Sequence, residues 1–151
     1  MSGISPQQAS RRRSEPVDKK IFRILDANFN RAKEGLRVCE DVVRFYCDEP
    51  SATRRYKAIR HQLTTLSAEL PFKDMMFSRD VAGDVGVKSS SSESRRAKVS
   101  DIFYANSQRA KESIRVLEEF AKLKNRKAAE GFKKLRYQVY AAEKMMLGKI
   151  V

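Results

Sequence analysis

The sequence has few of the residues that make metal sites, cross-links and membrane spans. It contains one histidine, His61, and two cysteines without a Cys-x-x-Cys pair, so it lacks the usual ligands of a zinc site. Cys39 and Cys47 would lie about 12 Å apart along one helix, which is too far for a disulfide. No run of about 20 apolar residues and no signal-peptide core is present. We therefore expect no membrane span and a cytoplasmic location.

Acidic residues are also in deficit, with 19 Asp and Glu against 32 Lys and Arg, a formal net charge of +13. This balance predicts attraction to polyanions, phosphorylated ligands or anionic membranes, and composition alone does not choose among them. The high charged share is typical of long amphipathic helices with solvated faces. At 151 residues the chain is long enough for one core. We expect a disordered basic tail over residues 1–16 and a single helical domain over 17–151.

One segment of the chain occurs twice. Residues 27–41 match residues 105–119 at nine of fifteen positions. A second match, between residues 56–63 and 132–139, follows at an offset that is shorter by two residues. A period this long indicates two copies of one supersecondary unit, here a helix hairpin.

Apolar residues recur at the 3.6-residue period of an amphipathic helix in four stretches. The first stretch runs to about Phe45, Ser51 is expected to cap the second, and Asn125 starts the fourth. The fold class is therefore all-α: a four-helix bundle from two repeated hairpins, 17–70 and 97–147, with a long central loop, 71–96. The predicted core stripes are Leu25, Ala32, Leu36, Cys39 and Val43; Ala58, Ile59, Leu63, Leu66 and Leu70; Phe103, Ala110, Ile114, Leu117 and Ala121; and Phe132, Leu135, Val139, Ala142 and Met146.

The central loop is too long and too polar for a bundle turn, and loops of this length are usually functional or disordered. Before a tract of four serines, it carries Arg79, Asp80, Gly83, Asp84 and Gly86. Glycines let a backbone approach a phosphate, and carboxylates can hold Mg²⁺ while the metal bridges phosphates. The alternative, which the spacing alone favours, is a turn with capping aspartates, because no Gly-x-x-x-x-Gly-Lys-Ser/Thr loop is present.

Two asparagines, Asn28 and Asn106, lie inside the apolar arcs of the first and third helices. A buried amide without partners costs about 1–3 kcal/mol. Two interpretations stay open. The amides make an Asn–Asn or Asn–backbone contact across a pseudo-twofold axis, or one or both face a polar cavity between the two helices.

Charged residues are duplicated around the edge of the same arcs. Ordinary pairing on the helix surface is one explanation, since Arg37 and Asp41 have the i, i+4 spacing of an ion pair. The other explanation is a ligand site. The pairs at the boundary of the apolar arc favour a ligand site more than the outermost pair does. The boundary pairs are Arg31 with Arg109 and Glu34 with Glu112, and the outer pair is Arg37 with Arg115.

The longest motifs resemble a known family. They are residues 23–38, 57–61, 79–86, 105–120 and 135–137. Together they resemble a small helical family that occurs alone or fused N-terminally to thiamine-phosphate synthase. The family is described as a monofunctional hydroxymethylpyrimidine phosphate kinase of thiamine biosynthesis, and the resemblance covers roughly residues 20–145.

The resemblance implies a transferase that uses ATP to convert hydroxymethylpyrimidine phosphate into the diphosphate. Such chemistry needs positioning and charge neutralisation more than covalent catalysis. An ionised phosphate acceptor needs no strong general base, which suits a chain with one histidine. We assign the roles as follows: catalytic, Arg31, Arg109, Asp80 and Arg79; substrate-binding, Asn28, Asn106, Arg37, Arg115, Gly83 and Gly86; Mg²⁺-binding, Asp84, Glu34 and Glu112.

Two other functions are compatible with the composition. The net charge and the basic run at residues 11–13 suit a helical nucleic-acid-binding module, although no reader motif is present. The repeated helices also suit an oligomeric scaffold, and a homo-oligomer is compatible with the kinase as well. For the kinase, the partner is a phosphorylated pyrimidine, and no membrane or nucleic acid is expected.

Overall fold

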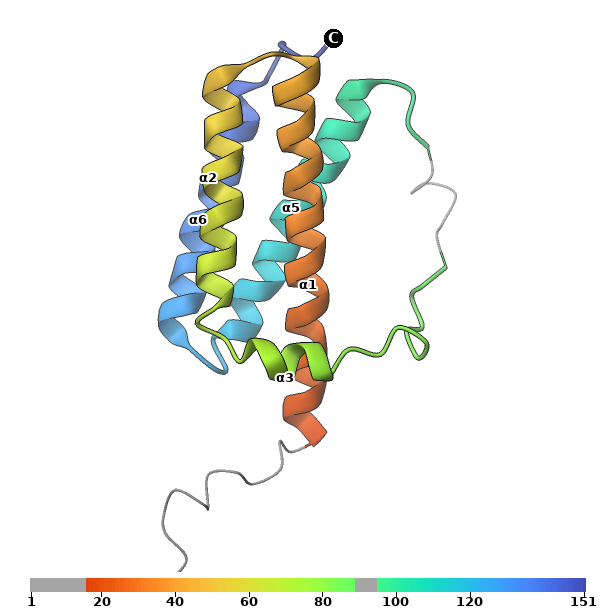
Figure 1. Cartoon of the computed structure of the whole chain (residues 1–151), viewed down its shortest axis with the longest axis vertical. Helices are drawn as coiled ribbons and strands as arrows, with labels where there is room; N and C mark the ends of the chain where they lie inside the picture. Colours follow the sequence, from red (N-terminus) through yellow and green to blue (C-terminus); the bar gives the residue numbers. More distant parts are fainter. Residues whose placement is uncertain (1–15, 89–94) are drawn as a thin grey trace, which may run out of the picture.

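The computed structural model describes residues 16–88 and 95–151, and within these the fold is all-α, as predicted. Two helical hairpins form a four-helix bundle (Figure 1). The expected tail lies outside the described residues except for Pro16, which begins the first helix, and so does the serine tract. The elements in chain order are α1 (Pro16–Asp41), η2 (Val42–Tyr46), α2 (Pro50–Ser67), α3 (Phe72–Phe77), α5 (Val99–Ala121) and α6 (Arg126–Met145).

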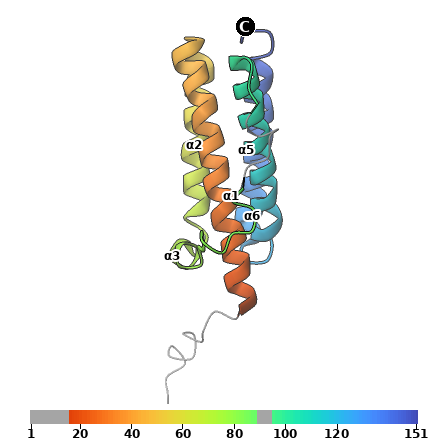
Figure 2. The same cartoon turned by 90° about the vertical axis from the view of Figure 1, so that its right-hand side faces the viewer.

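Each long helix packs against two antiparallel neighbours. α1 contacts α2 and α5, and α6 contacts the same two helices from the other side. In Figure 1, α1 and α6 run upward while α2 and α5 run downward, so a pseudo-twofold axis relates the hairpins. α3 lies across the lower part of α1, as both views show (Figures 1 and 2). The equivalent helices α1 and α5 therefore cross each other directly.

The core follows the repeat. Pairs of equivalent positions are fully buried on α1 and α5, such as Leu25 with Phe103 and Leu36 with Ile114. The stripes predicted for the first, third and fourth helices are confirmed. In the second stripe Ala58 is wrong because it is exposed, while Tyr56 fills the core instead. No helix in residues 16–88 or 95–151 is long and apolar enough to cross a membrane.

Two element boundaries differ from the prediction, at Ser51 and in the central connection. The end of the first helical stretch agrees with it, although the last turn is π-helical: α1 ends at Asp41 and continues as a π-helix to Tyr46, and the Cys47 N–H donates to the Val42 carbonyl at 3.0 Å. Ser51 is not a cap, because α2 begins at Pro50, which needs no N–H partner in the first turn. The central connection is not loop throughout, since α3 occupies six of its residues and buries Met75. Asn125 does cap α6, accepting the Ala128 N–H at 3.1 Å.

Two of the duplicated charges belong to buried ion pairs that tie each hairpin together. Glu40 on α1 accepts from Arg60 on α2 at 2.7 Å, and Glu118 on α5 accepts from Arg136 on α6 at 3.1 Å. The two carboxylates are almost fully buried. Burial alone would raise the pKa of Glu40, but the hydrogen bond and charge of Arg60 lower it below the ordinary value. The duplicated residues therefore include a structural ion pair in each hairpin, besides the residues proposed for a ligand site.

The outer arginines, Arg37 and Arg115, contact the same buried carboxylates. Arg37 approaches Glu40 at 3.8 Å, and Arg115 bonds Glu118 at 3.0 Å. The i, i+4 pair predicted for Arg37 with Asp41 is wrong, because Arg37 contacts Glu40, the carboxylate that receives Arg60 from the neighbouring helix. Both arginines are half exposed, and each adds a second partner to a buried carboxylate.

α1 and α5 lie close together at Gly35. A Cβ there would lie 2.8 Å from the backbone oxygen of Asn106, closer than real contacts allow. We expect Gly35→Ala to lower the free energy of unfolding by about 1–3 kcal/mol, because the carbonyl belongs to a helix and cannot yield cheaply. Urea unfolding followed by circular dichroism measures this. Asp41→Ala, at an exposed position of α1, is the control, and equal losses for the two variants would contradict the close approach.

Candidate functional site

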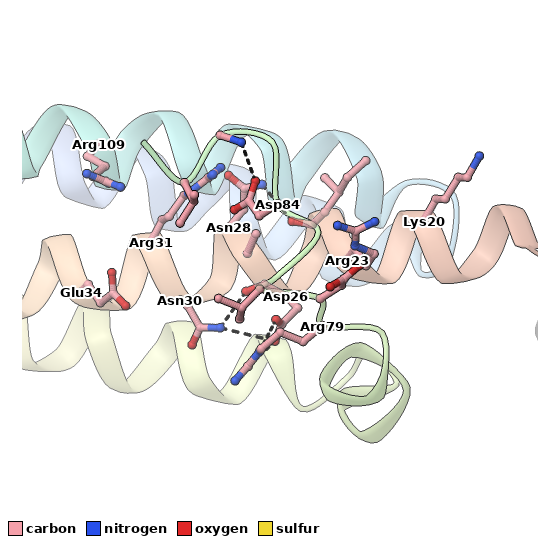
Figure 3. Close-up of a pocket in the computed structure, with 16 residues that line it drawn as sticks. Lys20, Arg23, Asp26, Asn28, Asn30, Arg31, Glu34, Arg79, Asp84 and Arg109 are labelled. Atoms are coloured by element: carbon pink, nitrogen blue, oxygen red, sulfur yellow. Dashed lines mark hydrogen bonds and ion pairs between the residues drawn. The ribbon is translucent and has the colours of Figure 1, made fainter. Parts of the chain in front are cut away.

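A pocket of about 850 Å³ opens between α1, the segment of residues 79–87 and α5 (Figure 3). α1 supplies most of its wall because its exposed face turns toward the segment for four turns, from Lys20 to Glu34. α5 contributes Arg109. The pocket thus lies where the two repeats meet, and one side of it is built from the part of the chain that does not repeat.

The crossing of α1 and α5 brings Arg31 and Arg109 into this pocket, where both extend into the space between the helices (Figure 3). They are equivalent positions of the repeat, and both line this pocket and the one that adjoins it. Within the described residues neither arginine makes an ion pair, and the same holds for Lys20 and Arg23 on the pocket wall. Four cations without carboxylate partners make the pocket attractive to an anion with several charges.

Asn28 is buried at the base of the pocket and donates from Nδ2 to the Ile24 carbonyl at 2.8 Å. Asn106 makes the same bond to Ile102, also at 2.8 Å, but it does not line the pocket. Both asparagines therefore make a backbone contact within their own helix, and no Asn–Asn bond forms between them. Asn28 alone also faces the cavity, with its Oδ1 and one N–H left over for a ligand.

The segment 79–87 forms two tight turns closed by its own aspartates. Asp80 accepts the Gly83 N–H, and Asp84 accepts the Gly86 N–H, each at 2.9 Å. A Cβ on Gly83 would displace the Asp80 carboxylate that closes the first turn. Asp80, Asp84 and Gly86 line the pocket and Gly83 does not. The capping turn and the pocket wall are thus the same piece of structure.

Arg79 is held by a residue that the sequence pattern did not single out. Its Nε and Nη2 donate to the two carboxylate oxygens of Asp26, both at 2.7 Å. This hydrogen bonding raises the pKa of Arg79. Asp26 is buried on α1, and its counterpart in the second repeat is Tyr104. The sequence did contain one signal for Asp26: an acidic residue lies inside the apolar arc of the first repeat, and the second repeat has no acid at that position.

The residues predicted to bind Mg²⁺ are divided between two places. Glu34 and Asp84 line the main pocket. Glu112 lines an adjoining pocket of about 520 Å³ with Arg31 and Arg109, and accepts a hydrogen bond from Gln108 at 2.9 Å. Among the described residues, no three His, Cys, Asp or Glu side chains gather as a ready metal site.

Arg37 and Arg115, predicted to bind substrate, line neither of these pockets. Both are engaged with the carboxylates of the buried ion pairs. On the helical wheel both arginines lie beyond the boundary of the apolar arc. In the structure their side chains accordingly lie outside the cavity.

Comparison with known proteins places the chain in a family. A family model described as the ThiD2 family matches residues 23–145. Three relatives are thiamine-phosphate synthases. That of Nostoc punctiforme is 36% identical over 89% of this chain, that of Rhodopirellula baltica 39% over 80%, and that of Synechocystis 39% over 85%.

The aligned parts cover 37%, 32% and 36% of these three relatives, so the chain spans about a third of their length. No solved structure matches the chain. Because the family match extends over both hairpins and the segment between them, the chain belongs to the ThiD2 family.

Proposed function

We propose that the protein is a phosphotransferase of thiamine biosynthesis that converts hydroxymethylpyrimidine phosphate into the diphosphate with ATP. The observation that carries the proposal is the meeting of Arg31 and Arg109, from the two repeats and without ion-pair partners, in a pocket of about 850 Å³. The names of the relatives support the pathway. The family resemblance of the motifs supports the kinase reaction.

The arginines suit phosphoryl transfer. A guanidinium binds phosphate oxygens through two parallel hydrogen bonds, and its charge stabilises the negative charge that spreads over the transferred group. Arg31 and Arg109 line both the main and the adjoining pocket. We assign the phosphate chain to this shared wall. Asn28, with a donor and an acceptor left over, is placed to bind the aminopyrimidine edge.

Carboxylates of the main pocket fit Mg²⁺ only together with a ligand. Mg²⁺ is usually bound through one or two carboxylates plus substrate phosphates, and Glu34 and Asp84 provide that number on the pocket wall. When bound, the ion would neutralise charge on the phosphates. We expect Asp84→Asn to raise the Mg²⁺ concentration needed for half-maximal rate about tenfold. A Mg²⁺ titration of the rate measures this, and an unchanged requirement would remove Asp84 from the metal site.

The proposal is tested by incubating the purified protein with ATP, Mg²⁺ and hydroxymethylpyrimidine phosphate. We expect the diphosphate and ADP in equal amounts, measured by anion-exchange chromatography. A known hydroxymethylpyrimidine phosphate kinase is the positive control. No diphosphate from this protein, under conditions where the control forms it, would refute the kinase function. The reaction uses metabolites of the cytoplasm, which is the location that we propose.

A further inference from the structure

We propose that Asp26 is a positioning residue of this site: through its bidentate bond to Arg79 it holds residues 79–87 as the wall of the pocket. Asp80 and Asp84 thereby stay at the cavity. The kinetic part of this inference rests on the proposed function, whereas the structural part does not. The catalytic role predicted for Arg79 is restricted by this contact, because its Nε and Nη2 already donate to Asp26 and only its remaining N–H groups are open to a ligand.

The geometry is that of a strong, directional contact. Two parallel N–H···O bonds of 2.7 Å join a guanidinium to a carboxylate, an arrangement that fixes orientation as well as distance. The Asp26 side chain is only 5% exposed, so water competes weakly for it. Asn30, one turn along α1, donates to the same carboxylate at 3.4 Å and to the Asp26 carbonyl at 3.0 Å. The acceptor is thus set in place by its own helix.

Little else attaches the segment to the bundle. In the described part of the chain, its other hydrogen bonds join near neighbours, as from the Asp84 N–H to the Val81 carbonyl at 3.3 Å. Its valines do not anchor it, because Val81 is 68% exposed and Val85 and Val87 are also exposed. The bond between Arg79 and Asp26 is therefore the polar contact through which the segment reaches α1 (Figure 3).

The contact between Arg79 and Asp26 also makes the α1 side of the site different from the α5 side. The pseudo-twofold axis gives α1 and α5 equivalent surfaces beside Arg31 and Arg109. Only α1 carries the acid, since Tyr104 takes its position on α5. A segment with an arginine at its start can therefore be held over the α1 half and not over the α5 half. Two like half-sites thus become one pocket with two different sides, as a reaction between two different substrates requires.

The test measures the segment and the reaction separately. We expect Asp26→Asn and Arg79→Gln each to speed amide exchange of residues 80–87 by about tenfold or more, with exchange in α2 and α6 unchanged. Hydrogen exchange with mass spectrometry measures this on the whole chain. Glu119→Gln is the control, because it removes an exposed carboxylate paired with Arg115 and Lys122 on the far end of α5.

For the reaction, we expect kcat/KM to fall about 10–100-fold in both single variants, because a displaced wall misplaces the groups on it. The double variant should be no worse than either single one, since both break the same contact. Arg79→Lys, which keeps the charge and loses the fork, should be intermediate.

Unchanged exchange in residues 80–87 would overturn the proposal, and so would faster exchange there with unchanged kcat/KM. If Asp26→Asn unfolds the bundle, exchange rises in α2 and α6 too. Arg79→Gln then decides, because the Arg79 side chain is 44% exposed and its loss disturbs the core less. If the wild-type protein forms no diphosphate, the kinase proposal fails. The exchange result still decides whether Asp26 holds the segment.

Discussion

Alanine in place of Arg31 or Arg109 is expected to lower kcat/KM for hydroxymethylpyrimidine phosphate about 10²–10³-fold, most of it in kcat. Removing one preorganised donor from the position where charge develops typically costs this much. Both arginines lack an ion-pair partner in the described structure, so their charge is available to a ligand. Steady-state kinetics with ATP and the pyrimidine phosphate each varied in turn measures the effect.

Two other arginines are the matched controls. Arg55 is exposed on α2, away from the main pocket, and its alanine variant should keep near-wild-type kinetics. Arg115→Ala separates the sequence prediction from the structure, since the sequence assigns Arg115 to substrate while the structure bonds it to Glu118 and Glu119. A loss of activity as large for Arg115→Ala as for Arg109→Ala would contradict the site described above.

Glu40→Gln is expected to lower the free energy of unfolding by about 3–5 kcal/mol, because it leaves the charge of Arg60 poorly compensated in the bundle. The Glu40 side chain is 1% exposed and that of Arg60 is 13% exposed, so neither is well solvated. Glu118→Gln should cost a similar amount, since it breaks the equivalent pair in the second hairpin. Urea unfolding, with the slope held common to all variants, measures both.

Glu119→Gln is the control for this experiment as well. Its carboxylate also contacts two cations, but it is 43% exposed, and exposed pairs contribute little to stability. The double variant Glu40→Leu/Arg60→Met should recover much of the stability lost by Glu40→Gln, because apolar groups can replace a buried pair. Equal losses for Glu40→Gln and Glu119→Gln would show that burial does not govern the pair.

The pH dependence of stability has a definite sign at Glu40. Its pKa is lowered on folding from 4.5, the value without these partners. The pair therefore contributes its full stability above about pH 4.5 and loses it as the pH falls through the lower value of the folded state. Glu40→Gln should unfold less steeply in acid than the wild type does. Parallel acid-unfolding curves for the two proteins would exclude this contribution.

The sequence predicted the fold well where the signal was local. Apolar residues at the helical period marked the buried faces of α1, α5 and α6, and Asn125 marked the start of α6. Two features that the sequence did not predict have a different origin: the π-helical turn that continues α1, and the short helix α3. The π-helix and the short helix that buries Met75 depend on what their residues pack against. Each is too short to show the apolar pattern that repeats over several turns of a long helix.

The candidate site could be predicted only in part. Arg31, Glu34, Asn28 and the aspartates of the central segment do line one pocket, but whether they bind ligand stays a prediction. Asp26 was missed, since the importance of its carboxylate depends on Arg79, 53 residues further along the chain. Periodicity places a residue on a face of its own helix and carries no information about a partner from elsewhere.

By itself the sequence determined that this chain is two copies of one amphipathic hairpin with a polar insertion between them, because repeats and helical periods are properties of neighbouring residues. The tertiary structure decided which duplicated charges are structural and which face a cavity. The antiparallel crossing of α1 and α5 brings Arg31 and Arg109 into one pocket, while the hairpin contacts take Glu40 and Glu118 into buried pairs. These assignments depend on distances between separate helices, which exist only once the bundle has formed.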